Sequence, residues 1–547
     1  MTTRTKTKSA RKPTARKITK KATKKVSKKV SKKATKRTAS RGNAKGLKVR
    51  MYRVGFGDFF LVTVPTARGD QFILIDCGVF KGRSGTGDLG SIVEAVEDMY
   101  KTTKKGKLAL VIMTHRHADH IAGFSKADFS KFTSSMVWMP YWEQFNADKG
   151  KKTSAKNFAA SGNQNLALDG NQNAAATGAQ TAAEEDENEA FNLQLDIQAL
   201  ATNLAMQFGS RKDPEAEEAL AQLGNATGIE DFSAVATGKK GVGGGNAGAL
   251  DVLKNHLGKN GENVRYYSAG DEPELPAELK GLKATILGPP PKKAKAFLAL
   301  TDLKKGVGQY LDSIEDGEDG PTAINPFRGE WSSKELPTEY KAKDLRGRDI
   351  DYDAAKKAVV ESQPDMLAAA AAKIETFLNN QSLVVLFEFG GKKLLFAGDA
   401  QAGNWEYWLY KISGPIKDPT KAGDIVEESK ELLQTIDFYK VGHHGSTNAT
   451  PIQMVEAAIA RPPGSKGFVS MCSTEDEVYG NPDKATEVPR TLLMDALRKD
   501  SCLLRSDAIP ITIKDPKLTV KARQGVTLPK PKVGKIKKAS LYLEYSF

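Results

Sequence analysis

The amino-acid sequence predicts an α/β protein in which helices cover β-sheet. From about residue 48 onward, apolar stretches rich in β-branched residues alternate with stretches typical of helices, and polar side chains stand at the ends of several apolar stretches. Together these two observations describe a layered α/β protein. The chain has 547 residues, too many for a single compact core, so we also expect a second domain, long insertions or disordered segments.

The expected elements can be followed along the chain. Two apolar stretches near the start are expected to pair as a hairpin, and the stretch that leads to His115 is expected to be a buried strand. A turn at Gly390–Gly391 separates two strands in the second half. In order, the expected strands are KVRMYRVGFGDFFLVTVP, DQFILIDCGVF, KLALVIMTH, the two in SLVVLFEFGGKKLLFAGDA, DFYKVGHHGS and GFVSMCS; ordered structure also returns at LKATILGPPP, and helices are expected at 188–209 and at RTLLMDALRKD.

Two insertions are expected to interrupt the folded part, at about 146–275 and 291–370. Residues 146–190 are rich in Ala, Asn, Gly, Gln and Ser, a composition with little capacity to form a core. The segment 146–250 could be a docking site for a regulatory protein or a site for a protease. The alternative interpretation is a surface insertion without function.

The positive charge is concentrated in one tail. Residues 1–50 contain 21 Lys and Arg and no Asp or Glu, whereas the other 497 residues hold 61 Lys and Arg against 66 Asp and Glu, a net charge of −5. We expect residues 1–46 to be a disordered tail and residues 47–547 to be the folded domain. The lysines expected to contact nucleic acid are Lys20, Lys21, Lys24, Lys25, Lys28, Lys29, Lys32 and Lys33.

The tail, residues 1–50, resembles the lysine-rich tails of linker histones, and DNA is the expected partner because lysines bind phosphates without sequence preference. The alternatives are a solubilising tail or attraction to another anionic surface, such as a ribosome or a membrane. Three distant cysteines exclude a disulfide framework, and no apolar run approaches the roughly 20 residues that span a bilayer. We therefore expect a cytoplasmic protein without a membrane partner, associated with the nucleoid if bacterial.

The sequence THRHADH, residues 114–120, has the spacing of a metal site. His115 and His117 can converge on one cation where the chain leaves a strand, while Asp119 and His120 can face a second. Two metal ions about 3.5–4 Å apart activate a water and stabilise the attacking and leaving oxygens. Imidazole and carboxylate ligands suit Zn²⁺ or Mn²⁺.

The motif resembles the HxHxDH signature of the metallo-β-lactamase superfamily. The stretches YRVGFGDFFLV, FILIDCG, NNQSLVVLFEFGGKKLLFAGDA, YKVGHHGS and VYGNP are similar, in order, to the ComEC-type branch of that superfamily. The resemblance implies an αββα sandwich with the metal site at one edge of its two sheets, here with two long insertions and a basic tail.

The resemblance also implies roles for single residues. His115 and His117 would hold the first metal ion, Asp119 and His120 the second, and Asp399 would bridge both, so that Asp119, His120 and Asp399 serve catalysis. Either His443 or His444 would complete the second site, with His444 preferred. The residues expected to orient a ligand or contact substrate are Asp76, Ser446 and Asn481.

Two positions depart from the branch. Many members of the superfamily have a third histidine for the first metal, and the only histidine in that interval here is His256, which we expect to be an ordinary surface or interface residue. The branch also commonly has YGHP where this chain has YGNP; Asn481 can donate a hydrogen bond but cannot act as a general acid.

The function expected from these features is phosphodiester hydrolysis. The ComEC-type branch is associated with DNA degradation, and a hydroxide activated by two metal ions suits attack at phosphorus. The first hypothesis is thus a nuclease with little sequence specificity. The alternatives are a small-molecule hydrolase, such as a cyclic-nucleotide phosphodiesterase or lactonase localised by its tail, and a chromosome-binding protein with a vestigial site.

Overall fold

The computed structural model describes residues 46–80, 90–144, 214–229, 246–299, 371–416 except 373, 424–459 except 447, 461, 467–476, 478–479, 487–508 and 534–547. The chain divides into two units, residues 1–42 and 43–547, and every described residue belongs to the second. Four expectations lie outside the described residues: the lysine-rich tail with its eight named lysines, the low-complexity segment 146–190, the helix at 188–209 and Asn481.

An eight-stranded sheet has the strand order β15-β16-β1-β2-β3-β5-β7-β8. Its members are β1 (Lys48–Tyr52), β2 (Phe59–Thr66), β3 (Gly69–Cys77), β5 (Leu110–Ile112), β7 (Val137–Pro140), β8 (Val264–Tyr267), β15 (Lys535–Lys538) and β16 (Tyr542–Ser546). The predicted hairpin is β2–β3, which pairs Val62 with Ile73. The prediction that KVRMYRVGFGDFFLVTVP forms a single strand of this hairpin is wrong, because a loop through Gly55, whose φ is +89°, divides that stretch into β1 and β2.

A six-stranded sheet has the order β14-β13-β12-β11-β10-β9. Its members are β9 (Lys283–Gly288), β10 (Val384–Phe389), β11 (Lys392–Phe396), β12 (Phe438–Lys440), β13 (Phe468–Cys472) and β14 (Ser501–Arg505). The predicted turn at Gly390–Gly391 joins β10 to β11, and both glycines have a positive φ. Strands β11 to β14 run parallel, so the chain segments that follow β11, β12 and β13 leave the sheet at one edge.

The two sheets face each other across a shared apolar core. Phe60 of β2 packs edge-on against Phe396 of β11, with ring centroids 6.1 Å apart, and Trp138 of β7 stacks on Phe387 of β10 at 6.3 Å. One cluster of buried side chains includes residues of both sheets. Burial of such large apolar side chains is the main force that holds two sheets together.

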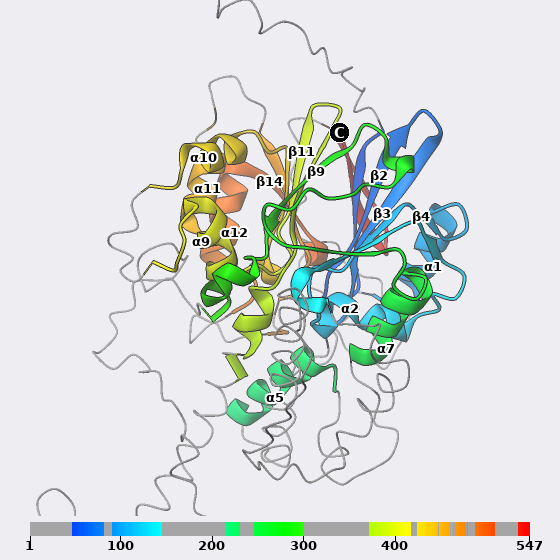
Figure 1. Ribbon diagram of the computed structural model, residues 1–547, viewed down its shortest axis with the longest axis horizontal. Coiled ribbons are helices and arrows are strands. Elements are labelled where there is room, and N and C mark those ends of the chain that lie inside the picture. The colour runs from blue at the N-terminus through cyan, green and yellow to red at the C-terminus, as the bar shows by residue number, and fades with distance from the viewer. Residues whose placement is uncertain are drawn as a thin grey trace, which may run out of the picture. The chain divides into compact units, whose positions relative to one another are not determined.

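Helices cover the outer faces of both sheets (Figure 1). On the eight-stranded sheet they are α1 (Ile92–Thr102), α2 (Ala118–Lys126) and α7 (Asn246–Asp251) with the π-helical turn η3 (Val252–Leu257); on the six-stranded sheet they are α9 (Ala402–Tyr410), α10 (Glu427–Gln434), α11 (Ile452–Ile459) and α12 (Thr491–Asp500). The prediction of an α/β protein is confirmed, as is the helix predicted at RTLLMDALRKD.

Part of the first predicted insertion belongs to the folded body. Strand β8 lies within the predicted boundaries 146–275, yet it pairs in parallel with β7 as an edge strand of the sheet. Helix α5 (Pro214–Thr227) lies in the same stretch and packs through Leu223 against a helical segment at 374–379, next to the second predicted insertion.

The remaining elements are short. They are β4 (Lys107–Leu108), β6 (Thr133–Ser134), η1 (Tyr141–Glu143), η4 (Ala277–Leu279), η5 (Lys292–Ala299), η8 (His443–Gly445) and η10 (Ser506–Ala508). Among the residues that the structure describes, no helix combines the length and apolar character needed to cross a membrane.

Candidate metal centre

The sequence THRHADH joins the end of β5 to the first turn of α2. Strand β5 is entirely buried and ends at Ile112, and α2 begins at Ala118. His115, His117, Asp119 and His120 are all 1% exposed or less. Four ionisable side chains thus occupy a few residues of chain in the interior, where each needs a partner.

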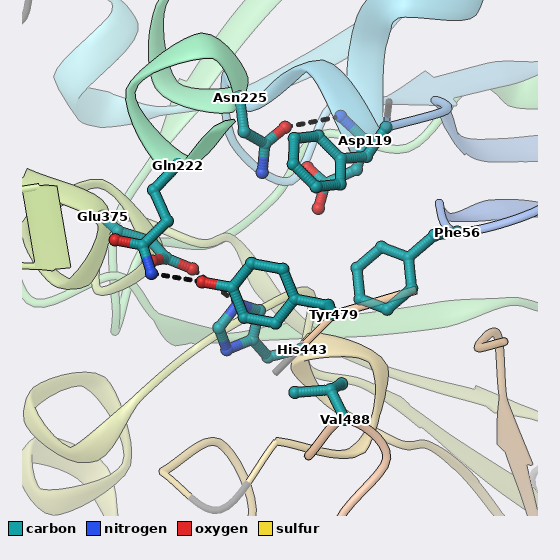
Figure 2. Close-up of a pocket in the computed structure, with 9 residues that line it drawn as sticks. Phe56, Asp119, Gln222, Asn225, Glu375, His443, Tyr479 and Val488 are labelled. Carbon is teal, nitrogen blue, oxygen red and sulfur yellow. Dashed lines mark hydrogen bonds and ion pairs between the residues drawn. The ribbon is translucent and has the colours of Figure 1, made fainter. Parts of the chain in front are cut away.

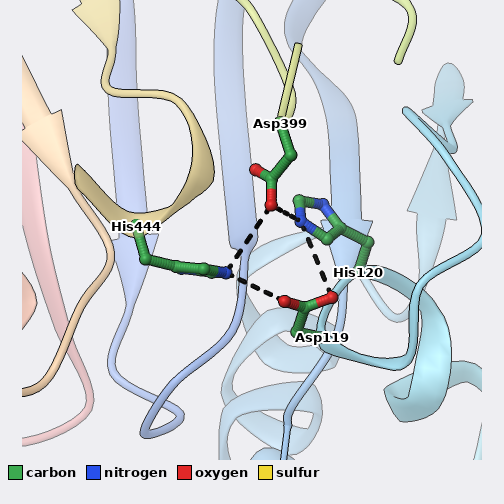
Figure 3. Close-up of side chains that lie close together, drawn as sticks. All are labelled: Asp119, His120, Asp399 and His444. Atoms are coloured by element: carbon green, nitrogen blue, oxygen red, sulfur yellow. Dashed lines mark hydrogen bonds and ion pairs between the residues drawn. The ribbon is translucent and has the colours of Figure 1, made fainter. Parts of the chain in front are cut away.

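Asp399 and His444 complete this cluster from the other half of the chain (Figure 3). Asp399 follows β11, and His444 lies in η8 after β12. Asp399 Oδ2 lies 2.9 Å from His120 Nε2, and His444 Nε2 lies 3.1 Å from Asp119 Oδ2. His444 and Asp119 are 325 positions apart in the sequence, so the site forms only when the two halves fold together.

Several ligand atoms of the cluster have no hydrogen-bond partner within the described part of the chain. Those atoms are His115 Nε2, both ring nitrogens of His117, Asp119 Oδ1, His120 Nε2 and Asp399 Oδ2. Buried polar atoms are almost always paired, because leaving one unpaired costs about 1–3 kcal/mol. Unpaired imidazole nitrogens and carboxylate oxygens gathered in one place fit divalent metal ions with nitrogen and oxygen ligands.

Two groups of these side chains could each hold an ion. Asp119, His120, Asp399 and His444 form one group, and His115, His117 and Asp119 form the other. Asp119 belongs to both groups. The structure therefore brings together the six side chains for which the sequence predicted metal binding, with His444 in the place left open between His443 and His444.

Hydrogen bonds fix two of the histidines, His120 and His444, so that Nε2 faces the cluster. His120 Nδ1 donates to Asp76 Oδ2 at 2.7 Å, and His444 Nδ1 donates to the Ser473 carbonyl oxygen at 2.7 Å. Asp76 is held in turn by the main-chain and side-chain groups of Thr114, at 2.8 and 2.6 Å. Such partners orient a metal-binding imidazole and select its tautomer, which is the role predicted for Asp76.

The pKa shifts of His115 and His117 suit metal binding. Burial lowers the pKa of His115 well below its usual value and also lowers that of His117, so both rings are neutral and offer a lone pair. Burial would lower the pKa of His120 as well, but the charges of the neighbouring carboxylates raise it well above its usual value. Burial alone would raise the pKa of Asp399, but the charges of His120 and Lys440 outweigh it and hold that pKa well below the usual range. The pKa of Asp119 is also lowered, because the interactions with His120 and His444 outweigh the effect of burial.

His443 lies beside the cluster and has other partners. Its Nε2 is 3.0 Å from Glu375 Oε1, and its Nδ1 is 3.3 Å from Gln401 Nε2. Burial lowers the pKa of His443, but the hydrogen bond to Glu375 and the charge of Asp399 raise it to about 9 overall. His443 is therefore paired with Glu375 and belongs to no metal-binding group of the described residues.

Two further candidates lie away from the ligand atoms. His256 Nε2 is 3.0 Å from the carbonyl oxygen of Phe129 and 3.1 Å from that of Phe132, so it is bound to main chain. Ser446, half-buried, donates its hydroxyl to Asn448 Oδ1 at 3.1 Å. Neither belongs to a metal-binding group within the described residues.

A narrow pocket opens onto the cluster (Figure 2). Its cavity volume is about 10 Å³, room for about one water molecule. The lining residues are Phe56, Phe80, Asp119, Gln222, Asn225, Glu375, His443, Tyr479 and Val488. The apolar wall includes Phe56, whose ring lies 4.2 Å from that of His444.

Helix α5 covers this pocket. Asn225 Oδ1 accepts a hydrogen bond of 3.0 Å from the main-chain N–H of Asp119, and Gln222 Nε2 donates to the Tyr479 hydroxyl. Both side chains point from α5 into the pocket (Figure 2). In this conformation α5 limits what can reach the cluster.

Sequence reasoning missed several residues of the site. Asp58 and Lys440 lie in motifs that carried the family resemblance, GFGD and YKVGHHGS, but neither received a role. Gln222 and Asn225 stand in a stretch interpreted as an insertion, and Glu375 lies just after the second one, so no local signal marked them.

No protein-family model matches the chain, and no curated protein matches it either.

Proposed function

We propose that the chain is a metal-dependent hydrolase of the metallo-β-lactamase superfamily, in its ComEC-type branch, with the αββα sandwich of that superfamily. We further propose that it is a phosphodiesterase acting on DNA with little sequence specificity. The observation that carries the proposal is the meeting of six buried His and Asp side chains, five of which have a ligand atom without a hydrogen-bond partner in the described part of the chain.

Two divalent metal ions, Zn²⁺ or Mn²⁺, would be held by these six residues. His115 and His117 with Asp119 would hold one ion, and Asp119, His120, Asp399 and His444 the other. When bound, such ions lower the pKa of a water and stabilise charge on phosphate oxygens.

The protein's own groups would orient the reactants. Asp76 and the Ser473 carbonyl hold the ligand rings of His120 and His444 in place. His443, protonated beside Glu375 and lining the pocket, would donate a hydrogen bond to a phosphate oxygen. A charged donor in a buried pocket stabilises an anion more strongly than it would in water.

The charge of the loaded site supports an anionic substrate. Four buried carboxylates, of Asp58, Asp76, Asp119 and Asp399, stand against one buried ammonium, that of Lys440. Two divalent ions with Lys440 bring five positive charges against these four negative ones, and the His443–Glu375 pair is balanced. Before a hydroxide forms, the site would thus carry one excess positive charge and would not repel a phosphodiester, which carries one negative charge.

Access to the site would require α5 to move. A cavity of about 10 Å³ admits one water, whereas a phosphodiester group is several times larger. We propose that α5, which lies within the segment 146–250 suggested as a regulatory region, swings off the pocket when substrate binds. A partner protein or a protease acting on that segment would have the same effect.

The composition of the pocket lining also favours a second candidate function, a small-molecule hydrolase such as a cyclic-nucleotide phosphodiesterase or a lactonase. A pocket with apolar walls and a few charged groups is typical of small-ligand sites. In that case the basic tail would localise the enzyme and take no part in turnover.

The test is a hydrolysis assay with Mn²⁺ or Zn²⁺ on plasmid DNA, linear DNA and bis(4-nitrophenyl) phosphate. The proteins compared are the full chain and the double variant Asp119→Ala/His120→Ala, with Asp128→Asn, an exposed acidic residue of the surface, as the matched control. We expect the full chain and the control to cut all three substrates and the double variant to cut none. Cleavage of the small diester without cleavage of DNA would favour the second candidate, and no hydrolysis of any diester would contradict the proposal.

A further inference from the structure

Lys440 is a buried lysine whose ammonium group is fully used. It is the last residue of β12 and is 2% exposed. Its Nζ donates to the Gly398 carbonyl oxygen at 2.8 Å and to Asp399 Oδ1 at 3.1 Å, and it forms an ion pair with Asp58 Oδ2. An ammonium group has three N–H donors, so these three acceptors account for all of them.

The two carboxylate oxygens of Asp399 have different surroundings, because only Oδ1 contacts Lys440. Oδ1 accepts from Lys440 and from the main-chain N–H of His443, at 3.0 Å. Oδ2 has no hydrogen-bond partner within the described residues and faces His120 Nε2 at 2.9 Å. The carboxylate is thus oriented so that a single oxygen is left for metal ions.

Asp58 links the same ammonium to the main chain of Asp119, the residue that belongs to both groups of candidate ligands. Its main-chain N–H donates to the Asp119 carbonyl oxygen at 2.8 Å, and its carbonyl accepts from the Gly78 N–H at 2.9 Å. Its side chain accepts from the Ser473 hydroxyl as well as from Lys440. Both the main chain and the side chain of Asp58 are therefore held by hydrogen bonds, and Asp58 in turn holds Lys440 in place relative to the start of α2.

We propose that Lys440, anchored by Asp58, is a positioning residue that orients Asp399 as a one-oxygen ligand and thereby sets the affinity for metal. The inference rests on the metal centre of the proposed function. Lys440 touches neither substrate nor, in this role, the metal ions; it acts through Asp399. Residues that orient a ligand in this way commonly change metal affinity by about 10–100-fold when removed.

The test measures metal binding to the full chain, not turnover. Zn²⁺ stoichiometry and affinity are determined by competition with a chromogenic chelator, and the absorption spectrum of the Co²⁺-loaded protein reports ligand geometry. The variants are Lys440→Met, Asp399→Asn and the combination of both. Lys392→Met is the matched control, because it removes an ammonium paired with Asp437 at the other end of β11.

We expect Lys440→Met to weaken Zn²⁺ binding by about 10–100-fold and to alter the Co²⁺ spectrum, while Lys392→Met changes neither. In the Asp399→Asn background, Lys440→Met should have no further effect on Zn²⁺ affinity, because the carboxylate through which Lys440 acts is already absent. Should Lys440→Met fail to fold because Asp58 is left unpaired, the double variant Asp58→Asn/Lys440→Met removes both charges and is expected to fold with the same loss of affinity.

The outcomes separate this inference from the proposed function. Wild-type affinity and spectrum in a folded Lys440→Met variant, or an equal loss in the Asp399→Asn background, overturns the inference alone. A wild-type chain that takes up two metal ions but cleaves no diester overturns the proposed activity and leaves the inference standing. A wild-type chain that takes up no metal overturns both.

Discussion

Gly78 lies directly after β3, where the main chain runs against the first turn of α2. A β-carbon at this position would collide with the main chain of Asp119 and His120, and main chain cannot rotate away as a side chain can. The same glycine donates its N–H to the Asp58 carbonyl at 2.9 Å. The absence of a side chain at Gly78 thus allows the close approach of the first turn of α2, and the N–H of the same residue holds Asp58.

We predict that Gly78→Ala displaces the start of α2 and reduces metal binding by at least tenfold, because overpacking a rigid site costs about 1–3 kcal/mol. Metal content after gel filtration and thermal stability would both be measured. Gly414→Ala is the control, since a β-carbon there meets no atom within 4 Å. Equal metal content in the two variants would contradict the prediction.

At the scale of single residues, the sequence predicted the side chains of the cluster better than the residues that support them. His115, His117, Asp119 and His120 are neighbours in the chain, so their spacing alone predicts a metal site. Asp58, Lys440 and Glu375 act through contacts between distant segments, and a lone Asp, Lys or Glu has no spacing that reveals such contacts. His444 could be preferred over His443, but only the fold shows which ring faces Asp119.

At the scale of elements, α9 contains a buried glutamate, Glu406, of which only one carboxylate oxygen has a hydrogen-bond partner among the described residues. Glu406 is 1% exposed; its Oε1 accepts from the Ile416 N–H at 2.8 Å, and its Oε2 has no partner among the described residues. Burial raises the pKa of Glu406 from 4.5 to about 7. The folded protein therefore binds more protons here than the unfolded chain between these two values.

We predict that this residue lowers stability as the pH rises from 4.5 to 7, by up to about 3 kcal/mol. Glu406→Gln keeps the acceptor and removes the charge, so its free energy of unfolding should exceed that of the wild type at pH 8 and differ little at pH 5. Denaturant titrations of both proteins at the two pH values provide the measurement. Parallel pH profiles would show that Glu406 does not carry the effect.

Helix α5 yields a prediction about access. Gln222→Ala or Tyr479→Phe removes a hydrogen bond that holds α5 over the pocket, and one such bond is worth about 1 kcal/mol. If the closed state excludes substrate, KM for a small diester should fall by up to about fivefold while the turnover number changes less. Gln71→Ala, a glutamine on the β2–β3 hairpin, is the control, and an unchanged KM in both pocket variants would argue against closure by α5.

Elements with strong local patterns were predicted well, and the exceptions have local causes. Strands β10 to β13 are short apolar runs bounded by turns, which their sequence makes visible. Strand β8 is four residues long and half exposed at its middle, so it carries little apolar signal and was placed in an insertion. The first strand expected in the hairpin is divided into β1 and β2. The sequence does not reveal this division, because Phe56, in the loop between them, is apolar and buried like the residues of both strands.

At the scale of the whole molecule, the boundary of the basic tail decides how it can be tested. The tail defined as residues 1–50 includes Lys48 and Arg50, but both residues lie in β1. The Arg50 guanidinium forms ion pairs with Glu544 at 2.7 Å and with Asp98 at 2.7 Å. A deletion through residue 50 would remove three residues of a central strand. Deletion of residues 1–42 leaves the unit 43–547 whole.

We predict that the chain without residues 1–42 hydrolyses bis(4-nitrophenyl) phosphate at the rate of the full chain. On DNA it should be slower, and its DNA binding should depend less steeply on salt, because fewer counterions are released when fewer lysines bind phosphate. Cleavage rates and affinities at several salt concentrations would be compared. The same salt dependence in both proteins would mean that the tail takes no part in DNA binding.

The strand order has a consequence for a chain that is cut. Residues 46–299 supply β9 to the six-stranded sheet, and residues 371–547 supply β15 and β16 to the eight-stranded sheet. Each piece therefore completes the sheet of the other, and each brings part of the ligand set. After a cut between them the two fragments would stay associated and would separate only on unfolding, so a break in the backbone need not disrupt the folded domain.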